Sequence, residues 1–125
     1  MKGRTMSRIA ILATGLVAVL ALAGPTGARP QATKLVGVTG PGFTITLKKG
    51  GKLVKTLPHG RYTITVQDKS NIHNFRLKGP GLNKQITTLS QTGSKTVTVT
   101  LKKGRYTYQC DPHVLQGMKK TFRVT

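Results

Sequence analysis

The chain has 125 residues, of which 21 are lysine or arginine and only 2 are acidic, so its formal net charge is +19. A field of this size favours acidic partners or anionic surfaces, and it bears on association rather than on fold. Asp68 and Asp111 are the only carboxylate side chains, and no G-x-S-x-G motif is present. An acid–base pair or a nucleophile elbow is therefore not expected, and the sequence predicts no enzyme.

The N-terminal segment has the layout of a secretory signal peptide. Three basic residues come first: Lys2, Arg4 and Arg8. The apolar run that follows, residues 9–23, has 15 residues, whereas a membrane span needs about 20. Small residues predict cleavage after Ala23 or Ala28. We expect residues 1–28 to be a signal peptide with a short linker and residues 29–125 to form one domain in the periplasm or at the cell surface; a retained N-terminal anchor is the alternative.

Past residue 33, apolar residues alternate with Thr, Lys and Arg, which is the period of a β-strand. The predicted strands, in chain order, are 34–38, 43–47, 62–66, 74–77, 86–89, 97–101, 106–108 and 122–124. Phe43 and the other aromatic residues fall on the apolar phase, so we expect them in the core rather than on a nucleic-acid stacking surface. Seven or eight short strands without a helical period predict an all-β fold, an antiparallel β-sandwich.

A short repeat predicts where two of these strands end. Residues 57–63 and 101–107 share the pattern L-x-x-G-R-Y-T, and each leads from a turn into a strand. One strand ends shortly before His73 and the other ends at Cys110. We therefore expect both residues at the same pole of the sandwich.

The residues richest in chemistry follow the second of these strands. Cys110, His113 and Met118 form a C-x2-H-x4-M loop, and His73 lies in a separate loop. Two imidazoles, one thiolate and a weak thioether are the ligand set of blue-copper sites. The alternatives are a buried free thiol with a methionine that only fills the core, or a zinc site, although structural zinc sites use no thioether. An unpaired cysteine in an exported protein favours the metal.

Through this loop and the upstream His73-Asn74-Phe75, residues 34–125 resemble the plastocyanin-like cupredoxins. The resemblance implies a Greek-key β-sandwich and one type 1 copper ion that alternates between Cu(I) and Cu(II). It implies His73, Cys110 and His113 as equatorial ligands and Met118 as the axial ligand. It also implies that Asn74 ties the two copper loops together by hydrogen bonds near the cysteine sulfur.

The function implied by this resemblance is electron shuttling outside the cytoplasm, with His113 near the surface as the residue that passes the electron. We expect a monomer that docks redox partner proteins with acidic surfaces, and an anionic envelope or membrane surface as a further partner, but no specific nucleic acid. An apolar docking patch is predicted around His113. Its candidate residues are Pro80, Leu82, Pro112 and Leu115. The alternative functions are copper storage and a metal-free basic interaction domain.

The remaining polar residues of note are assigned structural roles. His59 lies between Pro58 and Gly60 and is interpreted as an exposed turn residue far from the copper pole. Asp68 is expected to organise the turn before His73, and Asp111 the local turn that follows Cys110.

Overall fold

The computed structural model describes residues 3, 15, 17, 18 and 31–125. The strands are β1 (Thr33–Thr39), β2 (Ile45–Lys49), β3 (Lys52–Leu53), β4 (Thr56–Leu57), β5 (Gly60–Asp68), β6 (Phe75–Gly79), β7 (Leu82–Thr87), β8 (Gly93–Leu101), β9 (Gly104–Gln109) and β10 (Lys119–Val124), and the 3₁₀ helix η1 (Asp111–Gln116) precedes β10. Among the described residues, no helix is long and apolar enough to cross a bilayer. The cleavage positions Ala23 and Ala28 lie outside the described residues, so the signal peptide stays a prediction.

The strands form two five-stranded sheets, in the orders β3-β2-β1-β5-β8 and β4-β10-β9-β6-β7. This confirms the predicted all-β sandwich. The sheets are mixed rather than wholly antiparallel, because β1 pairs in parallel with β5 and β10 pairs in parallel with β4. Alternation of apolar residues predicts that a segment is a strand, but it carries no information about the direction of its neighbour.

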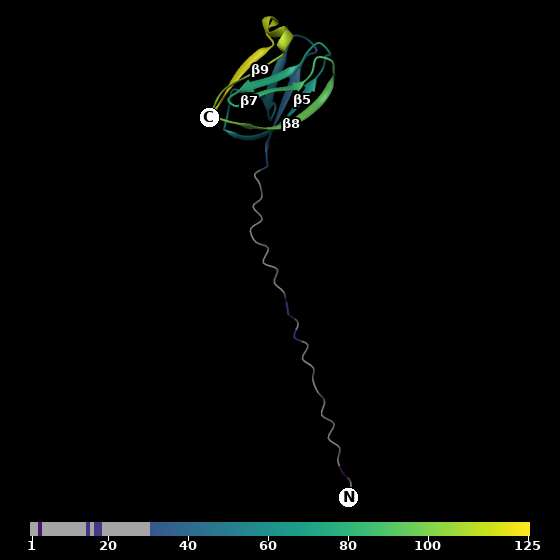
Figure 1. Ribbon diagram of the computed structural model, residues 1–125, viewed down its shortest axis with the longest axis vertical. Helices are drawn as coiled ribbons and strands as arrows, with labels where there is room; N and C mark the ends of the chain where they lie inside the picture. Colours follow the sequence, from purple (N-terminus) through teal and green to yellow (C-terminus); the bar gives the residue numbers. More distant parts are fainter. Residues whose placement is uncertain (1–2, 4–14, 16, 19–30) are drawn as a thin grey trace.

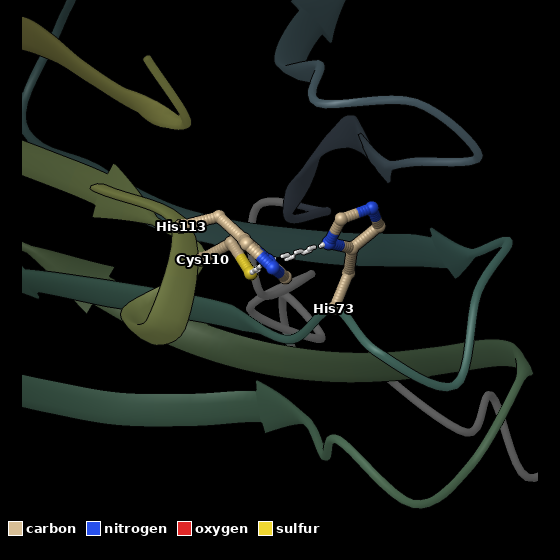
Figure 2. Close-up of side chains that lie close together, drawn as sticks. All are labelled: His73, Cys110 and His113. Carbon is tan, nitrogen blue, oxygen red and sulfur yellow. Dashed lines mark hydrogen bonds between the residues drawn. The ribbon is translucent and has the colours of Figure 1, made fainter. Parts of the chain in front are cut away.

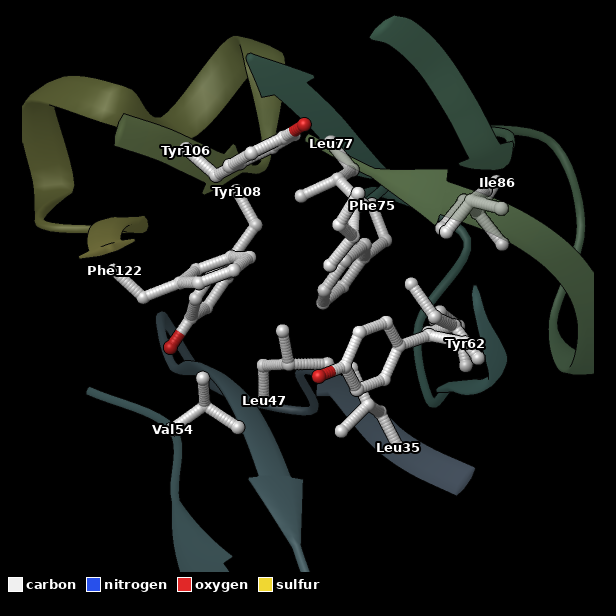
Figure 3. Packing of buried hydrophobic residues seen from close by; sticks show 14 of the residues in the cluster. Leu35, Leu47, Val54, Tyr62, Phe75, Leu77, Ile86, Tyr106, Tyr108 and Phe122 are labelled. Atoms are coloured by element: carbon white, nitrogen blue, oxygen red, sulfur yellow. The ribbon is translucent and has the colours of Figure 1, made fainter. Parts of the chain in front are cut away.

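The core lies between the sheets, where the period-two pattern directs one face of each strand inward (Figure 3). Two stacked aromatic pairs fill it, Phe75 with Tyr108 at a centroid distance of 5.5 Å and Tyr106 with Phe122 at 5.4 Å. The prediction that Phe43 lies in the core on a strand was wrong, because its side chain is 54% exposed and β2 begins only at Ile45.

Two predicted strands differ from the observed ones at a boundary with a loop. The backbone N–H of Gly40 donates to Thr44 O at 2.9 Å and closes residues 40–44 into a loop, so the alternating pattern starts before the strand does. The predicted strand 86–89 likewise differs, because β7 ends at Thr87 and Leu89 is exposed. Both departures place apolar side chains on loops at one end of the sandwich.

The two ends of the sandwich are distinct. One end, here called the η1 pole, carries loops 40–44, 69–74, 88–92 and 110–118, the last of which contains the helix η1. The other end, the opposite pole, carries turns 50–51, 58–59, 80–81 and 102–103. Figure 1 shows η1 at one end of the sandwich and the start of β1 at the other. Both β5 and β9 run toward the η1 pole, which confirms the geometry predicted from the L-x-x-G-R-Y-T repeat.

Candidate metal centre

His73 is held in the loop between β5 and β6 and is fully buried. Asp68, the last residue of β5, accepts a hydrogen bond from the backbone N–H of Ser70 at 3.2 Å, and the N–H of His73 donates to Ser70 O at 3.3 Å. This confirms the turn role predicted for Asp68. Gly40 packs against the imidazole at φ +77°, and a Cβ there would lie 2.7 Å from His73 Cδ2. Glycine is needed at this position because the backbone is left-handed and the ring leaves no space.

The loop from Cys110 to Met118 is folded back on itself. Cys110 precedes η1, and Gly117 ends it in the left-handed conformation at φ 92°. The N–H of Met118 donates to His113 O at 3.2 Å, while the N–H of Cys110 donates to Met118 O at 3.0 Å. The cysteine and the methionine are therefore neighbours at the η1 pole, and both side chains are buried.

Three donor atoms from these two loops face one another (Figure 2). His73 Nδ1 lies 3.0 Å from His113 Nδ1, and Cys110 Sγ lies 3.3 Å from His113 Nδ1 and 3.6 Å from His73 Nδ1. Among the described residues, this is the group of histidine, cysteine and acidic side chains arranged to hold a metal ion. The structure thus unites His73 with Cys110 and His113, which the sequence placed in two separate loops.

The donor set suits a soft or borderline metal ion. Bonds from such a metal to imidazole nitrogen and thiolate sulfur are about 2.0–2.3 Å long, so one ion can reach all three atoms of a triangle with sides of 3.0–3.6 Å. Burial raises the pKa of the Cys110 thiol, and the nearby Asp111 and Asp68 add to this, although N–H groups of Asn74 and His113 oppose it. A thiolate here therefore calls for a bound cation, and the triangle provides a place for one.

Asn74 links the two loops, as the family resemblance implies. Its backbone N–H points at Cys110 Sγ at 3.5 Å. Its side chain donates through Nδ2 to Asp111 Oδ2 at 2.9 Å and accepts the backbone N–H of Asp111 through Oδ1 at 2.7 Å. Asn74 is buried, so its own groups have little access to water, and these bonds fix the sulfur relative to the His73 loop.

Asp111 does more than organise the local turn that the sequence predicted. Its carboxylate also accepts hydrogen bonds from Arg76 Nε at 2.8 Å and Gln109 Nε2 at 3.0 Å. Burial alone would raise the pKa of Asp111, but the hydrogen bonds from Gln109, Arg76 and Asn74 and the charge of Arg76 outweigh it and lower the pKa below its usual value. The carboxylate is therefore an anchor between β6, β9 and the cysteine loop.

Sequence reasoning missed Arg76. The available signal was the position of Arg76 on the outward-facing side of β6, between the buried Phe75 and Leu77. Its guanidinium also donates to Asn83 Oδ1 at 3.1 Å and Gln85 Oε1 at 2.8 Å on β7. The pairing register that brings these partners together is a tertiary property.

The surface beside His113 is apolar, but its composition differs from the prediction. Phe43 stands edge-on to the rings of His113 and His73, with centroid distances of 5.1 Å and 5.9 Å. Leu115 is 97% exposed and Ile72 is 52% exposed. With Pro112, which is also exposed, these residues form the apolar surface of the η1 pole.

Pro80 and Leu82 do not belong to that surface, so this part of the prediction was wrong. Pro80 O accepts a hydrogen bond from Tyr106, and its ring lies against Gly104, the first residue of β9. Cys110 follows the other end of the same strand. The hairpin turn between β6 and β7 therefore lies at the opposite pole.

His59 is exposed, as predicted, and lies in the turn between β4 and β5 at the opposite pole. Its Nδ1 is 2.9 Å from Thr125 O, and because a carbonyl oxygen only accepts, Nδ1 is the donor. The imidazole is thus engaged with the C-terminal strand and stands apart from the metal-binding group.

A β-sandwich that brings two imidazoles, one cysteine and a nearby methionine to one pole defines a cupredoxin-like blue-copper protein. The sequence pattern of the copper binding proteins of the plastocyanin/azurin family matches residues 41–125, and the chain belongs to this family. Copper is accordingly its cofactor.

Solved structures are similar in fold. Rusticyanin from Thiobacillus ferrooxidans has a TM-score of 0.57 and 20% sequence identity, covering 78% of this chain and 79% of that chain. Dithionite-reduced auracyanin from the photosynthetic bacterium Roseiflexus castenholzii has a TM-score of 0.52 and 21% identity, covering 75% of this chain and 98% of that chain. No curated protein matches the sequence.

Proposed function

We propose that this protein is an exported electron carrier that holds one copper ion through His73, Cys110, His113 and Met118. The observation that carries the proposal is the donor triangle of His73, Cys110 and His113, with sides of 3.0–3.6 Å, on loops that hydrogen bonds tie together. Two histidines, a cysteine and a weak methionine ligand suit both copper oxidation states.

The bound copper would supply reversible one-electron chemistry, and the residues around it keep its surroundings constant. Asn74 and Asp111 hold the sulfur and the His73 loop in one arrangement, so little movement accompanies a change of charge. His73 is buried, whereas His113 is partly exposed. His113 therefore offers the route by which an electron enters or leaves through the η1 pole.

The apolar surface of the η1 pole is the proposed docking site for a redox partner. Phe43, Ile72 and Leu115 are exposed there, and exposed apolar clusters mark interaction sites. The net charge predicts an acidic partner, but most of the basic turn residues lie at the opposite pole, away from this docking site. An acidic partner therefore stays a prediction.

The visible spectrum after addition of Cu(II) to the metal-free protein tests the proposal. We expect one copper per chain, intense thiolate-to-copper absorption, and repeated reduction and reoxidation without loss of metal. Cys110→Ser is the control and should abolish the absorption whether or not copper remains. Colourless binding, or release of copper at each reduction, would instead identify a storage protein.

A further inference from the structure

Basic side chains are concentrated at the turns of the opposite pole. Lys49 and Lys52 flank the turn between β2 and β3, while Lys102 and Lys103 form the turn between β8 and β9. Two arginines follow the neighbouring turns at the starts of β5 and β9. These six exposed residues, here called the basic pole cluster, are Lys49, Lys52, Arg61, Lys102, Lys103 and Arg105.

The turns that carry the cluster adjoin one another. Gly60, at the start of β5, pairs with Leu101, at the end of β8. The side chain of Lys102 lies across Gly81, with Nζ 3.4 Å from the position of a Cβ at that glycine. Lys49 and Arg61 line one pocket of about 410 Å³. The positive charges therefore gather on adjoining turns at one end of the sandwich, where Lys49 and Arg61 line a recess.

No acidic side chain balances this surface. Asp68 and Asp111, the only two in the sequence, both lie at the η1 pole, and Asp111 is already paired with Arg76. Both acidic side chains are thus separated from the basic pole cluster along the length of the domain. β9 separates the two poles by about 17 Å, which is roughly twice the Debye length of about 8 Å at physiological ionic strength.

We propose that the basic pole cluster docks the domain on an anionic phospholipid membrane, with the copper site directed away from the bilayer. Clustered lysines and arginines are attracted to anionic lipid surfaces, and the recess between Lys49 and Arg61 offers a seat for a lipid phosphate. β1 also begins at this pole with Thr33, so the chain enters the domain on the membrane-facing side.

An acidic redox protein fits this surface less well. Seated on the basic pole cluster, it would be a strand length of about 17 Å from Cys110, while Phe43 and Leu115 at the η1 pole would stay uncovered. Membrane docking through the opposite pole leaves that apolar surface free. The lipid contact involves no copper ligand, so it stands or falls independently of the proposed electron transfer.

Sedimentation with vesicles tests the charge complementarity, using the metal-free chain from residue 29 onward in every arm, because the apolar run 9–23 would itself bind a bilayer. We expect binding to phosphatidylglycerol vesicles that exceeds binding to phosphatidylcholine vesicles and weakens with salt. Lys102→Gln with Lys103→Gln should lower the partition coefficient about 25-fold, since each lysine near the surface contributes about fivefold. The matched pair Lys119→Gln with Lys120→Gln, exposed at the η1 pole, should change it less than twofold.

Three results would overturn the proposal. Equal losses from the two lysine pairs would show a diffuse charge effect, and equal binding to both lipids would show that charge has no role. Displacement by millimolar inorganic phosphate would assign the recess to free phosphate rather than to a lipid headgroup.

A second measurement tests the orientation. The chain has no tryptophan, so a single introduced tryptophan reports its own position. Brominated phosphatidylglycerol should quench the fluorescence of metal-free His59→Trp, at the opposite pole, and leave Leu115→Trp, at the η1 pole, unchanged. Quenching of Leu115→Trp alone, or of both variants equally, would contradict the proposed orientation.

Discussion

The hydrogen bonds of the Asp111 carboxylate predict that removing it lowers the stability of the domain and also alters the copper site. Asp111→Ala removes three side-chain hydrogen bonds, from Asn74, Arg76 and Gln109. Each such bond contributes about 0.5–1.5 kcal/mol net. The side chain is 33% exposed, so water replaces part of the loss and the lower half of the range applies. We expect the free energy of unfolding to fall by about 2 kcal/mol.

Urea unfolding of the metal-free protein measures this change. For a domain of this size, 2 kcal/mol corresponds to a decrease in melting temperature of about 8–16 °C. Asp111→Asn keeps an acceptor oxygen but loses the charge, so its effect should be about half as large. In the copper-loaded protein, a looser Asn74 changes the hydrogen bond to Cys110 Sγ, and the visible absorption band should shift.

A decrease of less than about 0.5 kcal/mol in the free energy of unfolding of Asp111→Ala would refute the anchoring role, because the carboxylate would then behave as an ordinary surface charge. A decrease of about 2 kcal/mol in the free energy of unfolding together with an unchanged visible spectrum would separate the stabilising role of Asp111 from an effect on the copper site. It would show that Asn74 holds the sulfur without help from Asp111.

Three further predictions concern single side chains. Met118→Leu should keep copper and colour but raise the reduction potential, because an apolar axial environment disfavours Cu(II); voltammetry showing no shift would argue against Met118 as a ligand. His113→Gly should lose the blue spectrum and regain it with added imidazole, whereas a spectrum that stays lost would place this position out of reach of solvent. Tyr106→Phe removes the hydroxyl that accepts from Lys102 N and donates to Pro80 O, so urea unfolding should show a loss of about 1–2 kcal/mol; a loss near zero would mean that water replaces both bonds.

The sequence by itself determined the residues from which the metal site is built. Ligand chemistry is encoded in residue type and short spacing, so the C-x2-H-x4-M loop and His73 were recognisable before any fold was known. The period-two pattern likewise determined most strands and their inward faces, including Tyr62 in β5 and Tyr108 in β9. The loop motif and the period-two pattern are local signals, because they depend on side chains only a few residues apart. His73 lies 37 residues before Cys110, and the repeat and the family resemblance placed it at the same pole.

Only the tertiary structure decided which distant residues meet. Asp111 finds Arg76 through the register of β6 and β9, and Phe43 leaves the core because a loop closes before β2. Pro80 lies at the opposite pole because the turn between β6 and β7 is a full strand length from Cys110. The net charge was visible in the sequence, but the gathering of six basic side chains at the pole opposite the copper site was not. Strand direction and register set these relations, and neither is written into the alternation of apolar and polar residues along a single strand.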